Sequence, residues 1–373
     1  MKLTILVENL KKALMVAEKA LSKSNTMPIL NSFLLKADPN KNKLIISATN
    51  LEIGIETSIS AKIEKEGEIV IPSKNFLSFF YQLSDPKAEI QSEEKTLKIK
   101  TDYYQASFQS YDINEFPIIP EIKTKKFIKM ESNLLSQGFE QVAISAGISD
   151  LRPELNGIFL NFSKQGLKLA ATDVFRLSEK TIPLTEIQTN FEENINCLIP
   201  LKTAQEVSRI AKDKLELVEI YIEENQIGFK WEDTTFISRL LEGEFPEYSS
   251  IIPQSFKIKG VVFYNKLFEA LKVSGVFSSR LNDVKLKFIP KEKRLILKSA
   301  DSSIGENEAI VNFESVEGEE IEATFNYHYL LDGVSVLSPK DKIFIALADI
   351  DKPIYLKSFN DQSYFYILMP LRI

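Results

Sequence analysis

One short motif recurs three times in this chain, about every 125 residues. Each copy is an apolar run that ends at a small, polar or acidic corner: Leu44–Asn50, Leu167–Asp173 and Leu295–Asp301. A second landmark follows each copy, at Val70–Ser73, Leu198–Leu201 and Thr324–Tyr327. A third landmark closes each copy, at Phe116–Pro117, Phe245–Pro246 and Met369–Pro370. Three landmarks repeated in the same order predict three copies of one domain in a chain of 373 residues.

Each predicted domain combines two helices with antiparallel strands, which is an α+β fold. Apolar residues three and four positions apart predict the first helix of each copy, at Leu10, Leu14, Ala17 and Leu21, at Leu135, Phe139, Val142 and Ala146, and at Leu267, Leu271, Ser274 and Phe277. A second helix is predicted after each second landmark, where Pro72 and Pro200 suit a first helical turn. Polar links near 122–130 and 250–259 predict domain limits at 1–122, 123–253 and 254–373.

The charge is distributed unevenly along the chain. The whole chain has 46 basic and 52 acidic residues and a net charge of −6, which argues weakly against a general nucleic-acid coat protein. Basic residues nevertheless outnumber acidic ones in the six predicted helix windows, 8–23, 73–84, 131–146, 200–214, 264–280 and 326–340. This pattern fits either ordinary solvated helix faces or a basic helical surface that attracts phosphates without reading base sequence.

The cysteine content and the hydropathy pattern favour a protein of the cytoplasm. The single Cys197 cannot form an internal disulfide, which fits a reducing compartment. No apolar run approaches the roughly 20 residues that a membrane-spanning helix needs, and we expect no membrane partner. Residues 1–8 are expected to form a first strand and not a signal peptide.

The residues that catalysis normally needs are scarce. The chain has one histidine, His328, and one cysteine, and it lacks the spacing of a zinc site or a phosphate-binding loop. Asp173 and Asp301 recur at the same corner as Asn50, so capping of a turn explains them better than a catalytic carboxylate pair does. We therefore expect no catalytic residues, no cofactor and no metal.

Five longer stretches carry a resemblance that covers the whole chain: Leu155–Gly157, Ala171–Leu177, Gly243–Tyr248, Phe325–Asp332 and Tyr366–Ile373. Together they resemble the bacterial DNA sliding clamp family, the beta subunit of the replicative DNA polymerase III. The resemblance implies three tandem clamp domains per chain and a head-to-tail dimer that closes a ring of six domains. It also implies helices that line the hole, sheets that form the outer wall, and a processivity factor that slides on duplex DNA and tethers the polymerase.

The resemblance further implies a hydrophobic pocket between the second and third domains. Short peptides of the polymerase, the clamp loader and repair proteins would bind there. The matching positions are Leu155, Thr172, Val174, Phe175, Arg176, Leu177, Pro246, Ile251, Asn326, Tyr329, Ile367, Leu368, Met369, Pro370, Leu371 and Arg372. This chain departs from common family usage at two positions. Phe175 stands where family members often have a histidine, and Ser250 stands where they often have a basic residue. Arg176 and Arg372 are expected to hold backbone carbonyls or a carboxylate of the peptide.

Two further sets of residues follow from the same resemblance. The residues implied to face DNA are Lys12, Lys74, Arg152, Lys202 and Arg209. The residues implied to meet across the dimer seam are Ala106 and Phe108 of one chain and Val276 and Phe277 of the other. From the sequence, Phe108 fits an inward core position equally well.

Two other functions stay open at this point. One is a protein-interaction scaffold that uses the same pocket but encloses no DNA. The other is an enzyme that uses Asp173 or His328. The basic helices favour a clamp over a scaffold, and the missing catalytic residues argue against an enzyme.

Overall fold

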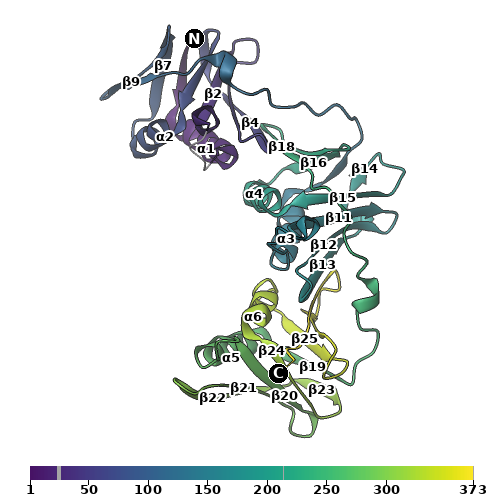
Figure 1. The fold of residues 1–373 in the computed structure, drawn as a ribbon. Coiled ribbons are helices and arrows are strands. Elements are labelled where there is room, and N and C mark those ends of the chain that lie inside the picture. The colour runs from purple at the N-terminus through teal and green to yellow at the C-terminus, as the bar shows by residue number, and fades with distance from the viewer. Residues whose placement is uncertain (23–26, 213, 373) are drawn as a thin grey trace. The chain divides into compact units, whose positions relative to one another are not determined.

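The computed structural model of the chain describes residues 1–22, 27–212 and 214–372 (Figure 1). In these residues the six predicted helices are all present, and they are α1 (Val7–Ala17), α2 (Ser73–Gln82), α3 (Ser132–Ala143), α4 (Leu201–Lys212), α5 (Tyr264–Val276) and α6 (Tyr327–Ser335). Three members of the predicted apolar stripes, Leu21, Ala146 and Phe277, lie beyond the ends of their helices. Ser274, which breaks the apolar stripe of α5, is nonetheless fully buried.

Tertiary contacts divide the chain into two compact units. The N-terminal unit comprises Met1–Asn133, Gln188–Phe191 and Arg209–Leu240, and the C-terminal unit comprises the remaining segments from Leu134 onward. The division runs through α3 and α4, so the middle predicted domain contributes to both units. The domain limits predicted above stay predictions.

The N-terminal unit contains two antiparallel sheets. The smaller sheet has the order β5 (Lys62–Lys65), β1 (Lys2–Leu6), β7 (Lys87–Glu93), β8 (Thr96–Lys100) and β9 (Gln105–Gln109). The larger sheet has the order β14 (Gln188–Thr189), β10 (Ile128–Glu131), β16 (Leu217–Ile222), β17 (Gln226–Lys230), β18 (Thr234–Arg239), β4 (Ile53–Ser60), β3 (Lys43–Thr49), β2 (Ser32–Asp38) and β6 (Gly67–Pro72).

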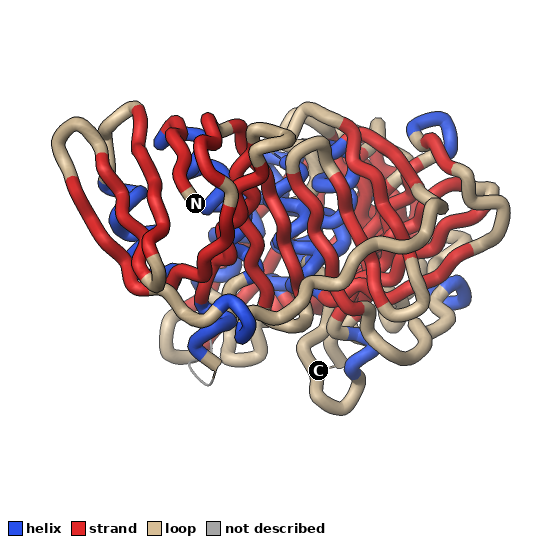
Figure 2. Tube along the Cα trace, turned by 90° about the horizontal axis from the view of Figure 1, so that it is seen from above, coloured by secondary structure: helices blue, strands red, loops and turns tan. Residues whose placement is uncertain are grey.

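The C-terminal unit repeats this plan. Its larger sheet has the order β15 (Ile195–Pro200), β11 (Gly157–Ser163), β12 (Gly166–Thr172), β13 (Arg176–Ile182), β27 (Tyr364–Leu368), β26 (Ile354–Ser358), β25 (Lys342–Leu347), β19 (Ile258–Phe263) and β23 (Ser315–Gly318). Its smaller sheet has the order β22 (Gly305–Asn312), β21 (Arg294–Asp301), β20 (Asp283–Ile289) and β24 (Ile321–Asn326). In Figure 2 the strands of each sheet run side by side, and short turns join many of them.

Each larger sheet is continuous across a predicted domain limit. In the N-terminal unit β18 pairs with β4, and Phe236 lies opposite Ile55. In the C-terminal unit β13 pairs with β27, and Arg176 lies opposite Leu368. Neighbouring predicted domains are therefore joined by complete backbone hydrogen-bond ladders, and not only by the covalent chain.

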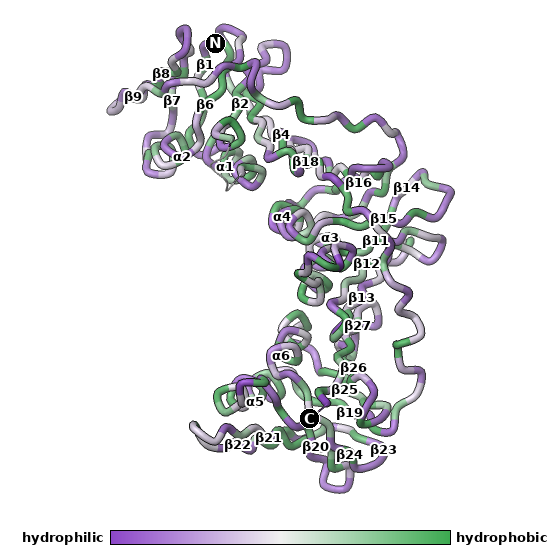
Figure 3. Tube along the Cα trace, viewed as in Figure 1, coloured by the Kyte–Doolittle hydropathy of each residue, from purple (hydrophilic) through white to green (hydrophobic). Residues whose placement is uncertain are grey.

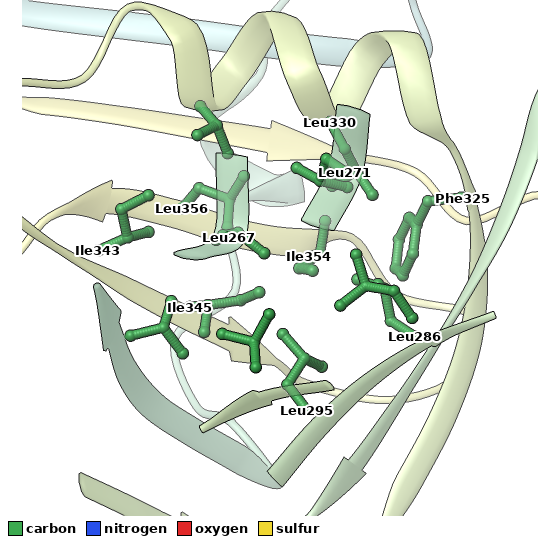
Figure 4. Close-up of a cluster of buried hydrophobic side chains, with 14 of the residues drawn as sticks. Leu267, Leu271, Leu286, Leu295, Phe325, Leu330, Ile343, Ile345, Ile354 and Leu356 are labelled. Carbon is green, nitrogen blue, oxygen red and sulfur yellow. The ribbon is translucent and has the colours of Figure 1, made fainter. Parts of the chain in front are cut away.

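One hydrophobic core of the C-terminal unit is formed by its two sheets and by the buried faces of α5 and α6 (Figure 4). Labelled side chains from both helices and both sheets meet there: Leu267, Leu271, Leu330, Leu286, Leu295, Phe325, Ile343, Ile345, Ile354 and Leu356. Hydropathy alternates along the strands, as Figure 3 shows and as expected where one face of a strand joins a core. Burial of each such side chain contributes about 2 kcal/mol to stability.

Among the described residues, no helix has both the length and the apolar character needed to cross a membrane.

Candidate functional site

A cavity of about 290 Å³ lies within the C-terminal unit. Five segments form it: the corner between β12 and β13, the short helical turn at Leu155, the linker before β19, the turn before β26, and the end of β27. Its lining residues are Arg152, Leu155, Thr172, Val174, Phe175, Arg176, Leu177, Pro246, Glu247, Tyr248, Ile251, Pro353, Ile367 and Met369. Most of these side chains are apolar, so the cavity can accept apolar groups of a ligand.

The corner between β12 and β13 is held by side chains that cap its backbone. Asp173 Oδ1 accepts hydrogen bonds from the backbone N–H groups of Phe175 and Arg176, each at 3.0 Å. Thr172 Oγ1 accepts a hydrogen bond from the N–H of Val174 at 3.1 Å and donates to the carbonyl of Arg176 at 2.7 Å. These bonds hold Val174 at φ 77° and leave its side chain 59% exposed beside Phe175, which is 62% exposed.

The same capping occurs at the equivalent corner of the first repeat. Asn50 Oδ1 accepts from the N–H groups of Glu52 and Ile53 at 3.0 and 2.7 Å, and Leu51 has φ 78°. In the third repeat, Asp301 Oδ1 accepts from the N–H of Ser303 at 2.8 Å. The three corner residues that the sequence repeat singled out therefore all cap turns.

The guanidinium of Arg176 is bound by other side chains of the same chain. Its Nε donates to Asp173 Oδ2 at 2.9 Å, its Nη1 donates to Asp332 Oδ2 at 2.6 Å, and the guanidinium lies 4.0 Å from the ring centroid of Tyr329. Burial acts to lower the pKa of Arg176, but Tyr366 and the two carboxylates outweigh it and raise the pKa above its ordinary value. Because two carboxylates already neutralise this guanidinium, it is a poor receptor for a carboxylate of a ligand, and of the two ligand groups expected from sequence only backbone carbonyls remain favoured.

The C-terminal segment is fastened to two strands after β27 ends. The N–H of Met369 donates to the carbonyl of Phe175 at 2.8 Å, and the N–H of Leu371 donates to the carbonyl of Thr324 at 2.7 Å. Met369 consequently lies beside the β12–β13 corner and lines the cavity together with the buried Ile367.

Ten of the sixteen residues predicted for the pocket line this cavity, and six do not. Leu368 is buried within the sheet, and Tyr329 packs on Arg176. Asn326 caps α6 by accepting from the N–H groups of His328 and Tyr329 at 3.0 and 3.3 Å. Pro370, Leu371 and Arg372 follow the lining residue Met369 and are at least partly exposed.

Four residues that line the cavity were not predicted for it: Arg152, Glu247, Tyr248 and Pro353. Arg152 was predicted to face DNA, and its Nε donates to Glu154 Oε1 at 3.0 Å. Glu247 and Tyr248 belong to the Gly243–Tyr248 stretch that already contributed Pro246, so their position in the sequence was available as a signal. Pro353 lies outside every stretch that the sequence singled out, so its place in the cavity could not be predicted.

The other residues predicted to face DNA lie on helices. Lys12 is on α1, Lys74 is in the first turn of α2, and Lys202 and Arg209 are on α4, all with exposed side chains. Within the helix limits of the structure, basic residues still outnumber acidic ones, but by less than in the longer predicted windows. These side chains can therefore contact a polyanion from solvent.

The residues predicted for the dimer seam lie near two sheet edges. Strand β9 is one edge of the smaller sheet of the N-terminal unit, and β22 is one edge of the smaller sheet of the C-terminal unit. Phe108 on β9 points inward, with its ring 5.5 Å from Phe76 and 5.7 Å from Phe79, and Ala106 is half-buried. Val276, at the end of α5, is 63% exposed, and the next residue, Phe277, is partly buried.

The two candidates for catalysis sit in structural surroundings. The carboxylate of Asp173 accepts hydrogen bonds from the backbone of the β12–β13 corner. The exposed His328 packs its ring against Tyr327, with the ring centroids 4.1 Å apart. In the described part of the chain, no cluster of histidine, cysteine and carboxylate side chains could hold a metal ion. Burial raises the pKa of the Cys197 thiol to about 12, so this thiol is protonated at neutral pH.

Replacing Asp173 with alanine should lower the free energy of unfolding by about 2 kcal/mol, because two backbone N–H groups and Arg176 lose an acceptor. Urea denaturation followed by circular dichroism measures the free energy of unfolding of the variant and of the wild type. Asp301→Ala is the matched control, because there one backbone N–H and the exposed hydroxyl of Ser303 lose an acceptor and no arginine pair is broken, so the loss should be smaller. Equal losses in both variants would contradict this account of the corner.

Comparison with known proteins follows the same threefold division. Family models described as the N-terminal, central and C-terminal domains of the DNA polymerase III beta subunit match residues 1–120, 129–247 and 249–372. A relative, the beta sliding clamp of Staphylococcus epidermidis, is 26% identical over 363 residues, which cover 95% of this chain and 94% of the relative.

Solved structures give the same result. The DNA polymerase sliding clamp from Bacillus subtilis is 27% identical with a TM-score of 0.92, and the alignment covers 100% of this chain and 99% of the other. The DNA polymerase III beta subunit from Thermotoga maritima is also 27% identical, with a TM-score of 0.89 over the same fractions.

Proposed function

The chain belongs to the DNA polymerase III beta subunit family, and from this premise we propose that it is a sliding clamp that makes a DNA polymerase processive. Two chains join head to tail in a ring that encircles duplex DNA. The ring tethers the replicative polymerase, the clamp loader and repair proteins through the cavity of the C-terminal unit. The observation that carries the tethering part of the proposal is that cavity, because the β12–β13 corner, the linker and the C-terminal segment converge on it.

Tethering needs no chemistry from the clamp itself. A polymerase held on a ring around its template rebinds at a high effective concentration, so each encounter yields many added nucleotides. The assignments of Asp173 to a turn and of His328 to a ring contact support a protein with no catalytic residues. We further propose that it works in the cytoplasm, as the single Cys197 led us to expect.

Binding in the cavity would rely on apolar anchors. Leu155, Leu177 and Ile367 form the buried walls, whereas Val174 and Ile251 are about half exposed and would lose that exposure beneath a peptide. Met369 can adapt its shape to different anchors. With Arg176 already neutralised, we expect recognition to rest on apolar side chains and backbone contacts of the peptide.

Retention on circular DNA tests the clamp against a scaffold that encloses no DNA. The chain is loaded by its cognate clamp loader and ATP onto a singly nicked plasmid and then separated by gel filtration. We expect it to stay with the circle at high salt and to leave when the plasmid is linearised, because the link is topological. Absence of retention, with polymerase binding intact, would favour the scaffold.

Charge reversal on the helices should weaken the encounter with DNA. The variant Lys12→Glu, Lys74→Glu, Lys202→Glu should load on the order of tenfold less well at physiological salt, because three phosphate contacts and their counterion release are lost. Loading measured across salt concentrations should also show a shallower slope. The control changes three exposed lysines outside the six α-helices, Lys164, Lys230 and Lys291, to glutamate, so the net charge is identical. Equal defects in both variants would remove the helical lysines from the DNA-facing surface.

A further inference from the structure

The linker before β19 forms one wall of the cavity, although few hydrogen bonds hold it. It is fastened at its two ends, where the N–H of Leu241 donates to the carbonyl of Leu198 at 2.9 Å and the N–H of Lys257 donates to the carbonyl of Leu347 at 3.0 Å. Between these ends it contributes Pro246, Glu247, Tyr248 and Ile251 to the lining. The position of this wall therefore depends on what holds the middle of the linker.

Two aromatic contacts hold the flanks of the linker on the larger sheet. The ring of Phe245 stacks on Phe159 of β11 with centroids 5.0 Å apart. The ring of Phe256 lies 5.5 Å from Tyr355 of β26 and 6.3 Å from Phe344 of β25. Apolar contacts of this kind attach the linker but have little directional preference, so they leave its exact placement undetermined.

One directional contact lies between them. The hydroxyl of Tyr248 donates to Glu179 Oε2 at 2.5 Å, and Glu179 sits on β13 with only 8% of its surface exposed. Among the described residues, this is the one hydrogen bond that joins residues 242–256 to the rest of the C-terminal unit. Burial and the hydrogen bond to Glu179 together raise the pKa of Tyr248 far above its ordinary value, so its proton stays in place near neutral pH.

Tyr248 is connected directly to the residues that face the cavity. Its carbonyl accepts a hydrogen bond from the N–H of Ile251 at 3.1 Å, which closes the short helical turn Ser249–Ile251. Pro246 is two residues before it in the chain. A displacement of Tyr248 therefore moves both apolar residues that the linker presents to a ligand.

We propose that the Tyr248–Glu179 hydrogen bond positions the linker wall and thereby sets the affinity of the cavity for partner peptides. This inference rests on the proposed function and adds a positioning residue to it. Tyr248 acts by presenting Pro246 and Ile251 at a fixed distance from the β12–β13 corner. Without the hydrogen bond the wall samples open positions, and a partner must close it at a cost in affinity.

The test measures binding of the cognate replicative polymerase to variants of the full chain. Tyr248→Phe and Glu179→Leu should each weaken binding about fivefold, the effect of one net hydrogen bond. The double variant should bind no more weakly than Glu179→Leu, because both substitutions remove this hydrogen bond and Glu179→Leu removes in addition the ion pair of Glu179 with Lys168 at 3.8 Å. Glu179→Gln should restore binding close to wild type, because its amide oxygen still accepts from the hydroxyl.

Tyr221→Phe is the matched control. Tyr221 donates to Glu219 Oε2 at 2.6 Å on β16, so the substitution removes the same kind of bond in the N-terminal unit, away from the cavity. It should leave polymerase binding unchanged. Hydrogen exchange followed by mass spectrometry separates positioning from general destabilisation, since Tyr248→Phe should accelerate exchange in peptides of residues 241–257 and not elsewhere in the C-terminal unit.

The outcomes are distinguishable. If the wild-type chain binds polymerase and Tyr248→Phe binds equally well, the inference is overturned and the proposed function stands. The inference also fails if Glu179→Gln is as weak as Glu179→Leu, because a retained acceptor would then be irrelevant. If the wild-type chain binds no polymerase, the proposed function fails, and this inference fails with it.

Discussion

Deletion of residues 369–373 should abolish polymerase binding and leave the oligomeric state unchanged. The deletion removes Met369, which lines the cavity, and the two backbone bonds that hold the segment against Phe175 and Thr324. Strand β27 ends at Leu368 and keeps its pairing with β13, so the sheet itself is retained. We expect a loss of at least 100-fold in affinity, about 3 kcal/mol or more, as for truncation of several hot-spot contacts.

Two variants make this result interpretable. A shorter deletion of residues 372–373 removes Arg372, which does not line the cavity, and it should bind polymerase nearly as well as the wild type. Ile251→Asp places a carboxylate on the opposite wall without shortening the chain, and it should also prevent binding. Binding is measured by biolayer interferometry and mass by light scattering. Unchanged binding after the longer deletion would remove the cavity from the proposed function.

Val276→Glu should convert the dimer into monomers. Val276 is 63% exposed at the end of α5, so a carboxylate at this position costs little in a single chain. It becomes costly only where a dimer seam buries it. Light scattering should give the 42.5 kDa mass of one chain in place of twice that mass. Retention on nicked circular DNA should be lost with it, because an open chain encloses nothing.

Val276 is a better position than Phe108 for testing the seam, because the ring of Phe108 points inward. Phe108→Asp would also be expected to give monomers, but it would place a carboxylate against Phe76 and Phe79 and unfold part of the smaller sheet. Ile350→Glu is the matched control, because this residue is 60% exposed in the turn between β25 and β26, in a different sheet from β22. If Val276→Glu stays dimeric, the seam does not include the end of α5.

The resemblance of five longer stretches predicted the family, the repeat and the apolar spacing predicted the α+β fold, and the comparisons confirm both predictions. They succeeded because helices and corners are local: Asp173 and its turn lie within three residues, and the stripe Leu267–Leu271 lies within one helical turn. The same locality explains why helix ends were less accurate, since Leu21 and Phe277 continue the spacing past the last helical residue.

What the sequence did not reveal depends on partners distant in the chain. The neutralisation of Arg176 needs Asp332, and the anchoring of Tyr248 needs Glu179, and no local pattern joins either pair. The inward direction of Phe108 was undecided because alternation along a strand identifies two faces without saying which one is buried. The pairing of β18 with β4 and of β13 with β27 likewise joins segments from different predicted domains.

The central position of β27 has a consequence for how the chain is made. Among the described strands β27 comes last in the chain, yet it lies between β13 and β26, in the interior of the larger sheet of the C-terminal unit. Until residues 364–368 leave the ribosome, β13 and β26 each present an unpaired edge, and unpaired edges recruit other strands. The larger sheet of the C-terminal unit therefore cannot close before β27 has emerged. A nascent chain stalled before β27 emerges exposes two strand edges that the folded chain pairs, and such exposed edges favour aggregation.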